Sequence, residues 1–398
     1  MRVFYAQAIY GEEEIEAVLE VLRDRPLTLV GGPAVKEFET RVAELFGKDS
    51  GLMVNSGSSA NTLAVACLGL ESGAEVIPPV LTFSTTVAPL VHHGLIPAFV
   101  DVEPDTYNID VERVEAMIGP KTRALMVPNL IGNLPDWQAL RAIADRHGLK
   151  VIEDSADTIG YRYRGATTGD ISDIVTTSFY ASHVITAGGF GGMVCFRDEA
   201  LKHQGLKLRG WGRSSSVLNE SERIEERLNV ELDGIPYDNK FLFESIGHNF
   251  LPSEMGAAFG LVQLARLPEY GRRRVENFQT LSAFFKDYED WFVLPRQREE
   301  TETYWLAMPL IVKQDAPFSR RDIQTYLESR DVQTRTVFTG NILRQPGFRN
   351  IERREDPAGY GNADRVMQGG LLIGCHQGMD AAQIDYVREV FRDFAEQQ

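Results

Sequence analysis

Hydrophobic and polar residues alternate along the chain with two different periods. Residues 12–24 and 34–46 carry apolar positions at helical spacing, which predicts two amphipathic surface helices. Further on, short apolar runs alternate with segments of helical period. The predicted strands are 51–54, 75–78, 96–100, 124–128 and 150–153, and the predicted helices are 62–70, 85–92, 111–118 and 137–147.

This alternation indicates the fold class. Strands separated by helices favour an α/β fold, in which a mostly parallel sheet has helices on both faces and binds ligands at the carboxyl ends of its strands. Two more strands are expected at 174–177 and 193–196. Beyond residue 196 the chain becomes polar and charged, which predicts a long surface excursion over the site.

The remaining third of the chain predicts a second unit. A long helix is expected at 252–264, and another after Pro268 up to Tyr288. Strands near 303–312 and 333–337 then indicate a smaller α/β unit. We therefore predict a large domain with N-terminal helices, followed by connecting helices and a small C-terminal domain. The predicted ranges are 1–255 and 256–398.

Composition narrows the possible partners. The 398 residues are 43% hydrophobic and 25% charged, as expected for a soluble globular enzyme. A formal charge of −16 argues against nucleic acid or an anionic membrane as the main partner. The first ten residues lack the pattern of a signal peptide, and no apolar run reaches the roughly 20 residues needed to cross a bilayer. We therefore expect a cytoplasmic protein.

No metal site is expected. The three cysteines, Cys67, Cys195 and Cys375, lie far apart and form no C-x-x-C pair, so they cannot supply a four-cysteine zinc or iron–sulfur site. The seven histidines are scattered along the chain.

A small-residue turn predicts a phosphate site. The turn N-S-G-S-S-A-N at 55–61 lies between a predicted strand and a predicted helix. Free backbone N–H groups and the helix dipole both favour an anion at such a helix start, so Gly57, Ser58 and Ser59 are candidate phosphate ligands. The alternative is an ordinary helix cap made by Ser58 or Ser59.

A second loop carries the candidate base. Ser178 is followed by His183 and then by four glycines around Phe190, a pattern typical of a loop that holds a phosphate and presents a base. Asp154 ends another predicted strand, in V-I-E-D-S-A-D (151–157). A carboxylate there either caps the next turn or pairs with a pyridinium nitrogen, which makes the ring an electron sink.

Taken in order, the motifs resemble one family along essentially the whole chain. The chain is identified as a member of the DegT/DnrJ/EryC1/StrS sugar aminotransferase family, which has the fold type I, aspartate aminotransferase-like architecture and uses pyridoxal phosphate (PLP). The matching stretches are G-G-P-A-V-K-E-F-E (31–39), N-S-G-S-S-A-N (55–61), L-T-F-S-T-T (81–86), F-V-D-V-E-P-D-T-Y-N-I-D (99–110), I-E-D-S-A-D (152–157), S-F-Y-A-S-H (178–183), G-H-N (247–249) and A-A-F-G-L-V-Q-L (257–264).

The resemblance implies a role for each matched residue. Asp154 would pair with the ring nitrogen, Phe83 would stack on the ring, and Asp157 would lie near the ring hydroxyl. Asn249 would reach the phosphate of the neighbouring subunit's cofactor, which implies a homodimer with shared active sites. The phosphate would be held by Gly57, Ser58, Ser59 and Ser178.

His183 indicates which branch of this family the chain resembles. Most members have a lysine at that position, which binds the cofactor covalently. A histidine resembles the branch of nucleotide-ketosugar 3-dehydratases, such as the GDP-4-keto-6-deoxy-D-mannose 3-dehydratases of deoxysugar and lipopolysaccharide O-antigen biosynthesis. Three further stretches resemble this branch: R-G-W-G-R (209–213), Y-D-N-K-F (237–241) and T-G-N-I-L-R-Q-P (339–346).

The branch implies a lyase reaction. The enzyme would remove the C3 hydroxyl from a nucleotide-linked 4-keto-6-deoxyhexose, with L-glutamate regenerating pyridoxamine phosphate (PMP). His183, with an ordinary pKa near 6.5, would take the proton from C4′ of the cofactor. One CDP-ketosugar relative uses an iron–sulfur cluster, for which this chain has too few cysteines. A PLP-dependent sugar aminotransferase and a non-catalytic PLP-binding regulator remain the alternatives.

The nucleotide diphosphate requires cations. Arg209, Arg213, Asn341 and Arg344 lie in matched stretches and are candidate substrate ligands, and arginine forks suit phosphate. Further candidates are Arg162, Arg164, Lys207 and Arg335, with solvated surface arginines as the alternative for Arg162 and Arg164. The chain also departs from the family pattern, with G-G-F-G-G at 188–192 in place of G-E-G-G, and with Asn129 where relatives often have histidine.

Overall fold

The computed structural model describes residues 1–24, 28–217 and 223–398. Its larger sheet has seven strands in the order β1-β8-β7-β5-β4-β2-β3. Neighbouring strands pair in parallel except β8, which is antiparallel to both β1 and β7. The strands are β1 (Ser50–Val54), β2 (Glu75–Ile77), β3 (Ile96–Pro97), β4 (Thr122–Pro128), β5 (Lys150–Ser155), β7 (Ile174–Ser178) and β8 (Gly192–Phe196). The predicted mostly parallel α/β fold is confirmed.

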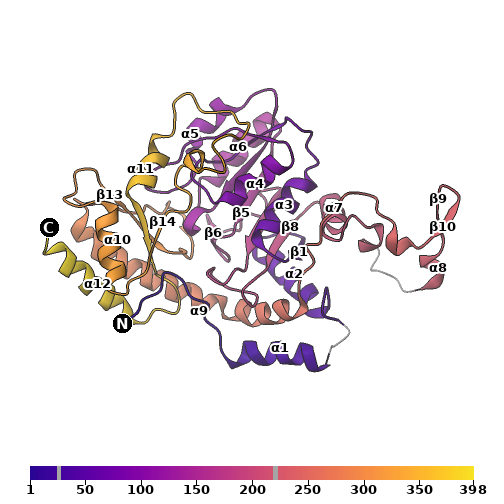
Figure 1. The fold of residues 1–398 in the computed structure, drawn as a ribbon, viewed down its shortest axis with the longest axis horizontal. Coiled ribbons are helices and arrows are strands. Elements are labelled where there is room, and N and C mark those ends of the chain that lie inside the picture. The colour runs from indigo at the N-terminus through magenta and orange to yellow at the C-terminus, as the bar shows by residue number, and fades with distance from the viewer. Residues whose placement is uncertain (25–27, 218–222) are drawn as a thin grey trace.

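Helices cover both faces of this sheet (Figure 1). Successive residues of β4 show why: Leu125 packs into one hydrophobic cluster and Met126 into the other, so both sides of the strand are buried. The flanking helices are α2 (Pro33–Leu45), α3 (Gly57–Cys67), α4 (Ser84–His92), α5 (Val111–Val114), α6 (Trp137–His147) and α7 (Glu199–Arg209). Helix α1 (Glu12–Asp24) lies against α9 instead.

A single long helix replaces two predicted ones. Helix α9 runs from Glu254 to Phe285 and continues through Pro268, so the expected break there is wrong. Proline removes one helical hydrogen bond at a cost of about 3 kcal/mol. Leu267 and Tyr270, which flank the proline, are both buried, and their packing offsets that cost.

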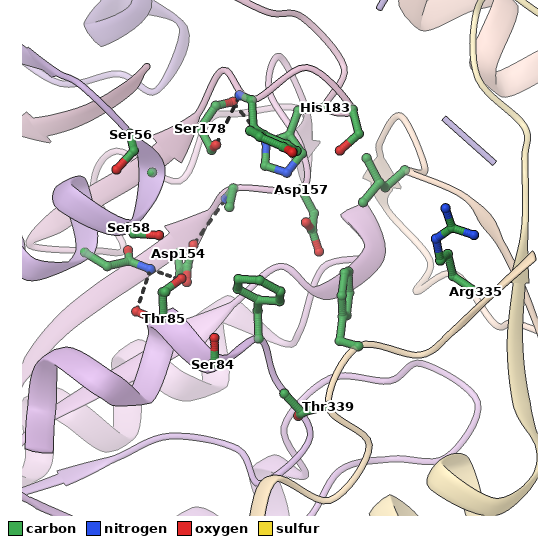
Figure 2. Close-up of a pocket in the computed structure, with 18 of the residues that line it drawn as sticks. Ser56, Ser58, Ser84, Thr85, Asp154, Asp157, Ser178, His183, Arg335 and Thr339 are labelled. Carbon is green, nitrogen blue, oxygen red and sulfur yellow. Dashed lines mark hydrogen bonds between the residues drawn. The ribbon is translucent and has the colours of Figure 1, made fainter. Parts of the chain in front are cut away.

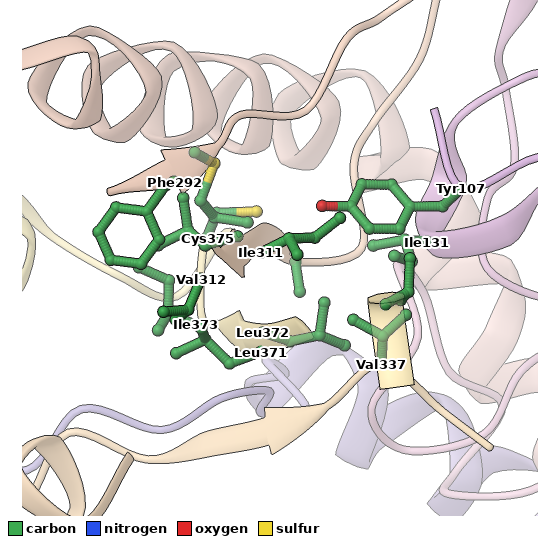
Figure 3. Close-up of a cluster of buried hydrophobic side chains, with 14 of the residues drawn as sticks. Tyr107, Ile131, Phe292, Ile311, Val312, Val337, Leu371, Leu372, Ile373 and Cys375 are labelled. Atoms are coloured by element: carbon green, nitrogen blue, oxygen red, sulfur yellow. The ribbon is translucent and has the colours of Figure 1, made fainter. Parts of the chain in front are cut away.

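A smaller antiparallel sheet follows, in the order β11-β13-β15-β14. Its strands are β11 (Phe292–Val293), β13 (Met308–Val312), β14 (Thr334–Thr336) and β15 (Gly370–Ile373), and its helices are α10 (Arg320–Ser329), α11 (Gly361–Gly369) and α12 (Ala381–Ala395). Its core also takes in Tyr107 and Ile131 from the region of the larger sheet (Figure 3). The division of the chain at residue 255 remains a proposal.

Several predicted boundaries were wrong. The strand expected at 96–100 ends at Pro97, and the strand expected at 303–312 begins at Met308. The helix expected at 111–118 is α5 followed by a 3₁₀ turn, Glu115–Met117. Helix α3 starts at Gly57, five residues before its predicted start, because Ser56 caps it there.

The polar excursion does not cover the site of its own chain. The segment with α8 (Ile224–Arg227), β9 (Val230–Leu232) and β10 (Ile235–Tyr237) projects from the side of the molecule beyond α7 (Figure 1). This corrects the expectation that it lies over the site. Across the described ranges, no helix is both long enough and apolar enough to span a bilayer.

Candidate active site

A cavity of about 770 Å³ lies where β5 and β7 end, beside β14 of the smaller sheet. Its wall brings together residues that are distant in sequence, and Figure 2 shows His183 and Asp157 pointing into the same space. Of the residues predicted to bind a cofactor or act in catalysis, those lining the cavity are Gly57, Ser58, Phe83, Asp154, Asp157, Ser178 and His183.

The start of α3 forms one corner of the cavity. Ser56 Oγ accepts a hydrogen bond from the Ser59 amide at 3.1 Å, so Ser56 caps the helix and not Ser58 or Ser59. The first amides of a helix have no partner within it, and those of Gly57 and Ser58 lie at the cavity wall. Ser59 does not line the cavity, and its hydroxyl accepts a hydrogen bond from Ser56 Oγ at 3.0 Å.

Gly57 allows this corner to close. A Cβ atom at Gly57 would lie 2.5 Å from Ser178 Cβ, closer than real Cβ contacts. The glycine therefore lets the end of β7 approach the first turn of α3. Two N–H groups at a helix start and the Ser178 hydroxyl together make a suitable site for a phosphate dianion.

Asp154 lies at the end of β5 and is held by three donors. Its Oδ2 accepts hydrogen bonds from Asn61 Nδ2 at 2.8 Å and from Thr86 Oγ1 at 2.9 Å, and its Oδ1 accepts one from the Ala156 amide at 3.2 Å. Burial raises the pKa of Asp154, and these hydrogen bonds oppose that rise. The side chain is thus prepared to face a cationic ring nitrogen.

The sequence interpretation missed the residues behind Asp154. Thr176 donates to Asn61 Oδ1 at 2.6 Å, and Thr82 donates to Thr86 Oγ1 at 2.9 Å. Asn61 and Thr86 both lie within the matched stretches 55–61 and 81–86. Their motifs were therefore a usable signal, although nothing in the sequence pattern joined them to Asp154.

His183 is half-buried in the cavity wall, and its Nδ1 lies 3.3 Å from the Ser178 carbonyl oxygen. Burial lowers its pKa to about 4, and the charge of Arg274 lowers it further, while the hydrogen bond to Ser178 opposes the shift. The ordinary pKa near 6.5 expected from the sequence is therefore too high for this environment. His183 is neutral at pH 7 and can accept a proton.

Phe83 and Asp157 complete the cofactor side of the cavity. The Phe83 ring is 51% exposed and meets the Phe338 ring edge-on, with centroids 6.0 Å apart. Asp157 accepts one hydrogen bond, from the Ile131 amide at 2.8 Å. Burial raises the pKa of Asp157 to about 7, and the neighbouring charge of Asp154 adds to the rise.

The four substrate ligands predicted from the matched stretches lie outside this cavity. Arg209 contacts Glu39 at 2.6 Å, and Arg213 lies over the rings of Trp211, Phe241 and Phe243. Arg344 and Asn341 both bind Asp364. Arg335 alone among the candidate cations lines the cavity. Arg162, Arg164 and Lys207 donate to Gly165, Glu300 and Glu244 respectively.

Two other predicted positions also lie outside the wall. The Asn249 side chain accepts a bond from the Leu251 amide at 3.4 Å and does not reach the cavity of its own chain. Asn129 lies behind β5, where it donates to Glu153 and Ser155 and accepts from Trp137. Phe190, from the loop that departs from the family pattern, does line the cavity and is 70% exposed.

Comparison with known sequences identifies the family. The sequence model of the DegT/DnrJ/EryC1/StrS aminotransferase family matches residues 8–392. The chain belongs to this family. Among curated proteins, the chain is similar to the lipopolysaccharide biosynthesis protein RfbH of Salmonella typhimurium strain LT2, with 34% identity over 97% of this chain and 90% of the relative. The dTDP-4-dehydro-2,6-dideoxy-D-glucose 3-dehydratase of Saccharopolyspora spinosa is 33% identical over 97% of this chain and 85% of its own length.

Solved structures show the same fold with PLP bound. The E. coli GDP-4-keto-6-deoxy-D-mannose 3-dehydratase with hydrated PLP has a TM-score of 0.86 and 30% identity, covering 98% of this chain and 100% of that one. A GDP-4-keto-6-deoxymannose 3-dehydratase with a trapped PLP–glutamate geminal diamine also has a TM-score of 0.86, with 28% identity over 98% and 99% of the chains. The aminotransferase-like fold is thus established for this chain.

Proposed function

We propose that the protein is a PLP/PMP-dependent 3-dehydratase that removes the C3 hydroxyl from a nucleotide-linked 4-keto-6-deoxyhexose. GDP-4-keto-6-deoxy-D-mannose is the first substrate to test, and L-glutamate is the proposed amino donor. The observation that carries the proposal is His183, a neutral histidine in the wall of a cavity whose other groups suit PLP.

The cavity suits PLP in three places. The start of α3 and Ser178 offer N–H and O–H donors for a phosphate, Phe83 offers a flat exposed ring, and Asp154 offers a carboxylate for a ring nitrogen. When bound, the cofactor supplies an electron sink and, in its amine form, a nitrogen that joins the sugar ketone. Lysine is absent from the described residues that line the cavity, so the chain offers no amine there for a covalent link.

His183 then determines the reaction. Its neutral imidazole would take a proton from C4′ of the bound cofactor, and the protonated ring would pass that proton to the departing C3 hydroxyl. Expulsion of that hydroxyl gives a 4-keto-3,6-dideoxy sugar, with ammonia released by hydrolysis. The Ser178 carbonyl beside Nδ1 fixes the ring orientation and leaves Nε2 for the proton transfer.

We also propose a homodimer that shares its active sites. Large apolar side chains lie exposed around the excursion, as expected for a surface that another chain covers. These are Trp211, Ile224, Ile235, Tyr237, Phe241, Phe243 and Ile246, the last 98% exposed. In this arrangement Asn249 serves the cofactor of the partner, as the family resemblance implies.

Substitution of His183, the proposed general base, tests the proposed reaction. His183→Lys should slow dehydration by at least about 100-fold, because general base catalysis is typically worth 10² to 10⁴ in rate. His203→Lys is the matched control, since His203 is half exposed on α7, where its Nε2 lies 3.3 Å from Glu199 Oε1. Dehydration by His183→Lys at the parental rate would contradict the assignment. A 4-amino sugar from the unaltered protein would instead indicate a sugar aminotransferase.

A further inference from the structure

Arg335 is a cavity cation without a carboxylate partner. It lies on β14 and is the one lysine or arginine among the described residues that line the cavity. Within the described ranges its hydrogen bonding is limited to Nη1, which donates to the neighbouring Thr334 carbonyl at 2.7 Å. Figure 2 shows Arg335 across the cavity from Ser56 and Ser58, which lie at the start of α3. Its other N–H groups are therefore available to a ligand.

The ring of Tyr5 lies against this guanidinium. Arg335 Cζ is 5.7 Å from the centroid of the Tyr5 ring, a distance at which an aromatic face attracts a cation. Tyr5 also lines the cavity, and none of the described residues hydrogen-bonds to its hydroxyl. Burial raises the pKa of Tyr5, and the charge of Asp157 adds to the rise, so the hydroxyl keeps its proton. The cavity wall thus holds a guanidinium and a hydroxyl together, each with a donor to offer.

The N-terminal segment holds Tyr5 in this place. The Val3 carbonyl accepts from the Gln333 amide at 2.9 Å, and the Tyr5 amide donates to Gln333 Oε1 at 3.0 Å. Gly374 leaves room for the segment, since a Cβ atom there would lie 2.5 Å from the Phe4 carbonyl oxygen. These contacts fix Tyr5 to the smaller sheet that also carries Arg335, so the two side chains are held as one unit.

We infer that Tyr5 and Arg335 together bind a carboxylate of the amino donor, L-glutamate. The inference rests on the proposed function, which assigns glutamate to this cavity. A dicarboxylate that enters a cavity lined by Asp154 and Asp157 needs a cation there, and Arg335 is the one that the described wall provides. A planar guanidinium beside a hydroxyl offers a carboxylate several donors in a fixed geometry. The Tyr5 ring holds the guanidinium, and the Tyr5 hydroxyl donates to the ligand.

The place of the pair favours the carboxylate over the diphosphate of the sugar substrate. Arg335 and Tyr5 lie in the wall of the same cavity as His183. The α-carboxylate of glutamate is bonded directly to the carbon that gives up the amino group. The diphosphate, in contrast, is separated from the reacting C4 of the sugar by the pyranose ring. An anion site this close to the base therefore suits the amino donor.

The first test measures binding of glutarate, a dicarboxylate that lacks the amino group and cannot react. Isothermal titration calorimetry gives its Kd for the full chain with PLP added. Tyr5→Phe keeps the ring beside Arg335 and removes the hydroxyl, so the Kd should rise at least about fivefold. Arg335→Met removes the cation and should raise the Kd at least about tenfold.

The matched controls make the same substitutions outside the cavity. Tyr386→Phe removes a hydroxyl that donates to the Arg330 carbonyl at 3.0 Å. Arg330→Met removes a guanidinium that lies 4.7 Å from the centroid of the Tyr326 ring. Both control variants should bind glutarate with a Kd within about twofold of the parental value.

The second test separates the two substrates. With PLP and L-glutamate but no sugar, formation of PMP is followed by absorbance. With PMP added directly and no glutamate, dehydration of GDP-4-keto-6-deoxy-D-mannose is followed in a single turnover. Tyr5→Phe and Arg335→Met should require at least about fivefold more glutamate in the first reaction, and should keep the sugar dependence of the second within about twofold.

Three results would overturn the inference. These are a higher requirement for the sugar with an unchanged requirement for glutamate, a glutarate Kd within about twofold of the parental value in Tyr5→Phe, and no glutarate binding by an unaltered protein that still forms PMP. Thermal melting shows whether each variant is folded. If Arg335→Met folds poorly, Tyr5→Phe alone decides, because it keeps the packing of the ring. Failure of the unaltered protein to form PMP from glutamate would instead refute the proposed function, and this inference with it.

Discussion

Removal of one hydroxyl behind Asp154 should weaken cofactor binding. Thr86 is buried, and its hydroxyl donates to Asp154 Oδ2 at 2.9 Å while accepting from Thr82 at 2.9 Å. Thr86→Val keeps the shape of the side chain and removes both of these hydrogen bonds, of which the one to Asp154 bears directly on the cofactor. Because the bond is strongest when Asp154 is ionised against the ring nitrogen, the loss falls mainly on the cofactor complex.

The size of the effect follows from that single bond. A hydrogen bond to a charged group contributes about 1.5–3 kcal/mol, which corresponds to a rise of about 10- to 150-fold in the Kd for PLP. The assay is equilibrium dialysis against PLP in phosphate-free buffer, with thermal melting to confirm that the variant is folded. Thr280→Val is the matched control, because its hydroxyl donates only within α9, to the Glu276 carbonyl at 2.8 Å. A folded Thr86→Val protein with a Kd within about twofold of the parental value would refute the reasoning.

Three further results are expected. Gly57→Ala should raise the Kd for PLP at least about tenfold, since its Cβ would displace Ser178, whereas Gly361→Ala, with open space around its Cβ, should not. Burial lowers the pKa of His183 to about 4, so this base is neutral above pH 5. The activity, measured as kcat/KM against pH, should therefore fall only below pH 5. A fall that begins at pH 6.5 or above would contradict this assignment. Lys48→Met should lower the free energy of unfolding in urea by about 2–4 kcal/mol, because Lys48 Nζ binds the buried carbonyls of Gly169 and Ser172; a loss under about 0.5 kcal/mol would contradict that role.

The local pattern of the sequence was enough to predict the larger sheet. The run 124–128, and the run 150–153 beyond the exposed Lys150, are buried on both faces, so their period and length are distinctive. The helix through Pro268 was not predictable in this way, because the packing that supports it comes from distant parts of the chain.

The candidate site was also predictable in part: residues in local motifs were found, whereas contacts between distant segments were not. Gly57, Ser178, Asp154 and His183 were found from motifs, and the fold brings them to one cavity. The position of Arg209 was not predictable, since its partner Glu39 is 170 residues away in sequence. The low pKa of His183 was also outside the reach of sequence patterns, because it arises from burial by several separate segments.

The central claim is that the protein dehydrates a sugar and does not aminate it. The most direct measurement is the mass of the nucleotide-sugar product after incubation with PLP, L-glutamate and GDP-4-keto-6-deoxy-D-mannose. The account predicts a product lighter than the substrate by one oxygen atom, with ammonia and 2-oxoglutarate formed in equal amounts and no product when glutamate is omitted. A 4-amino sugar formed without release of ammonia would contradict it.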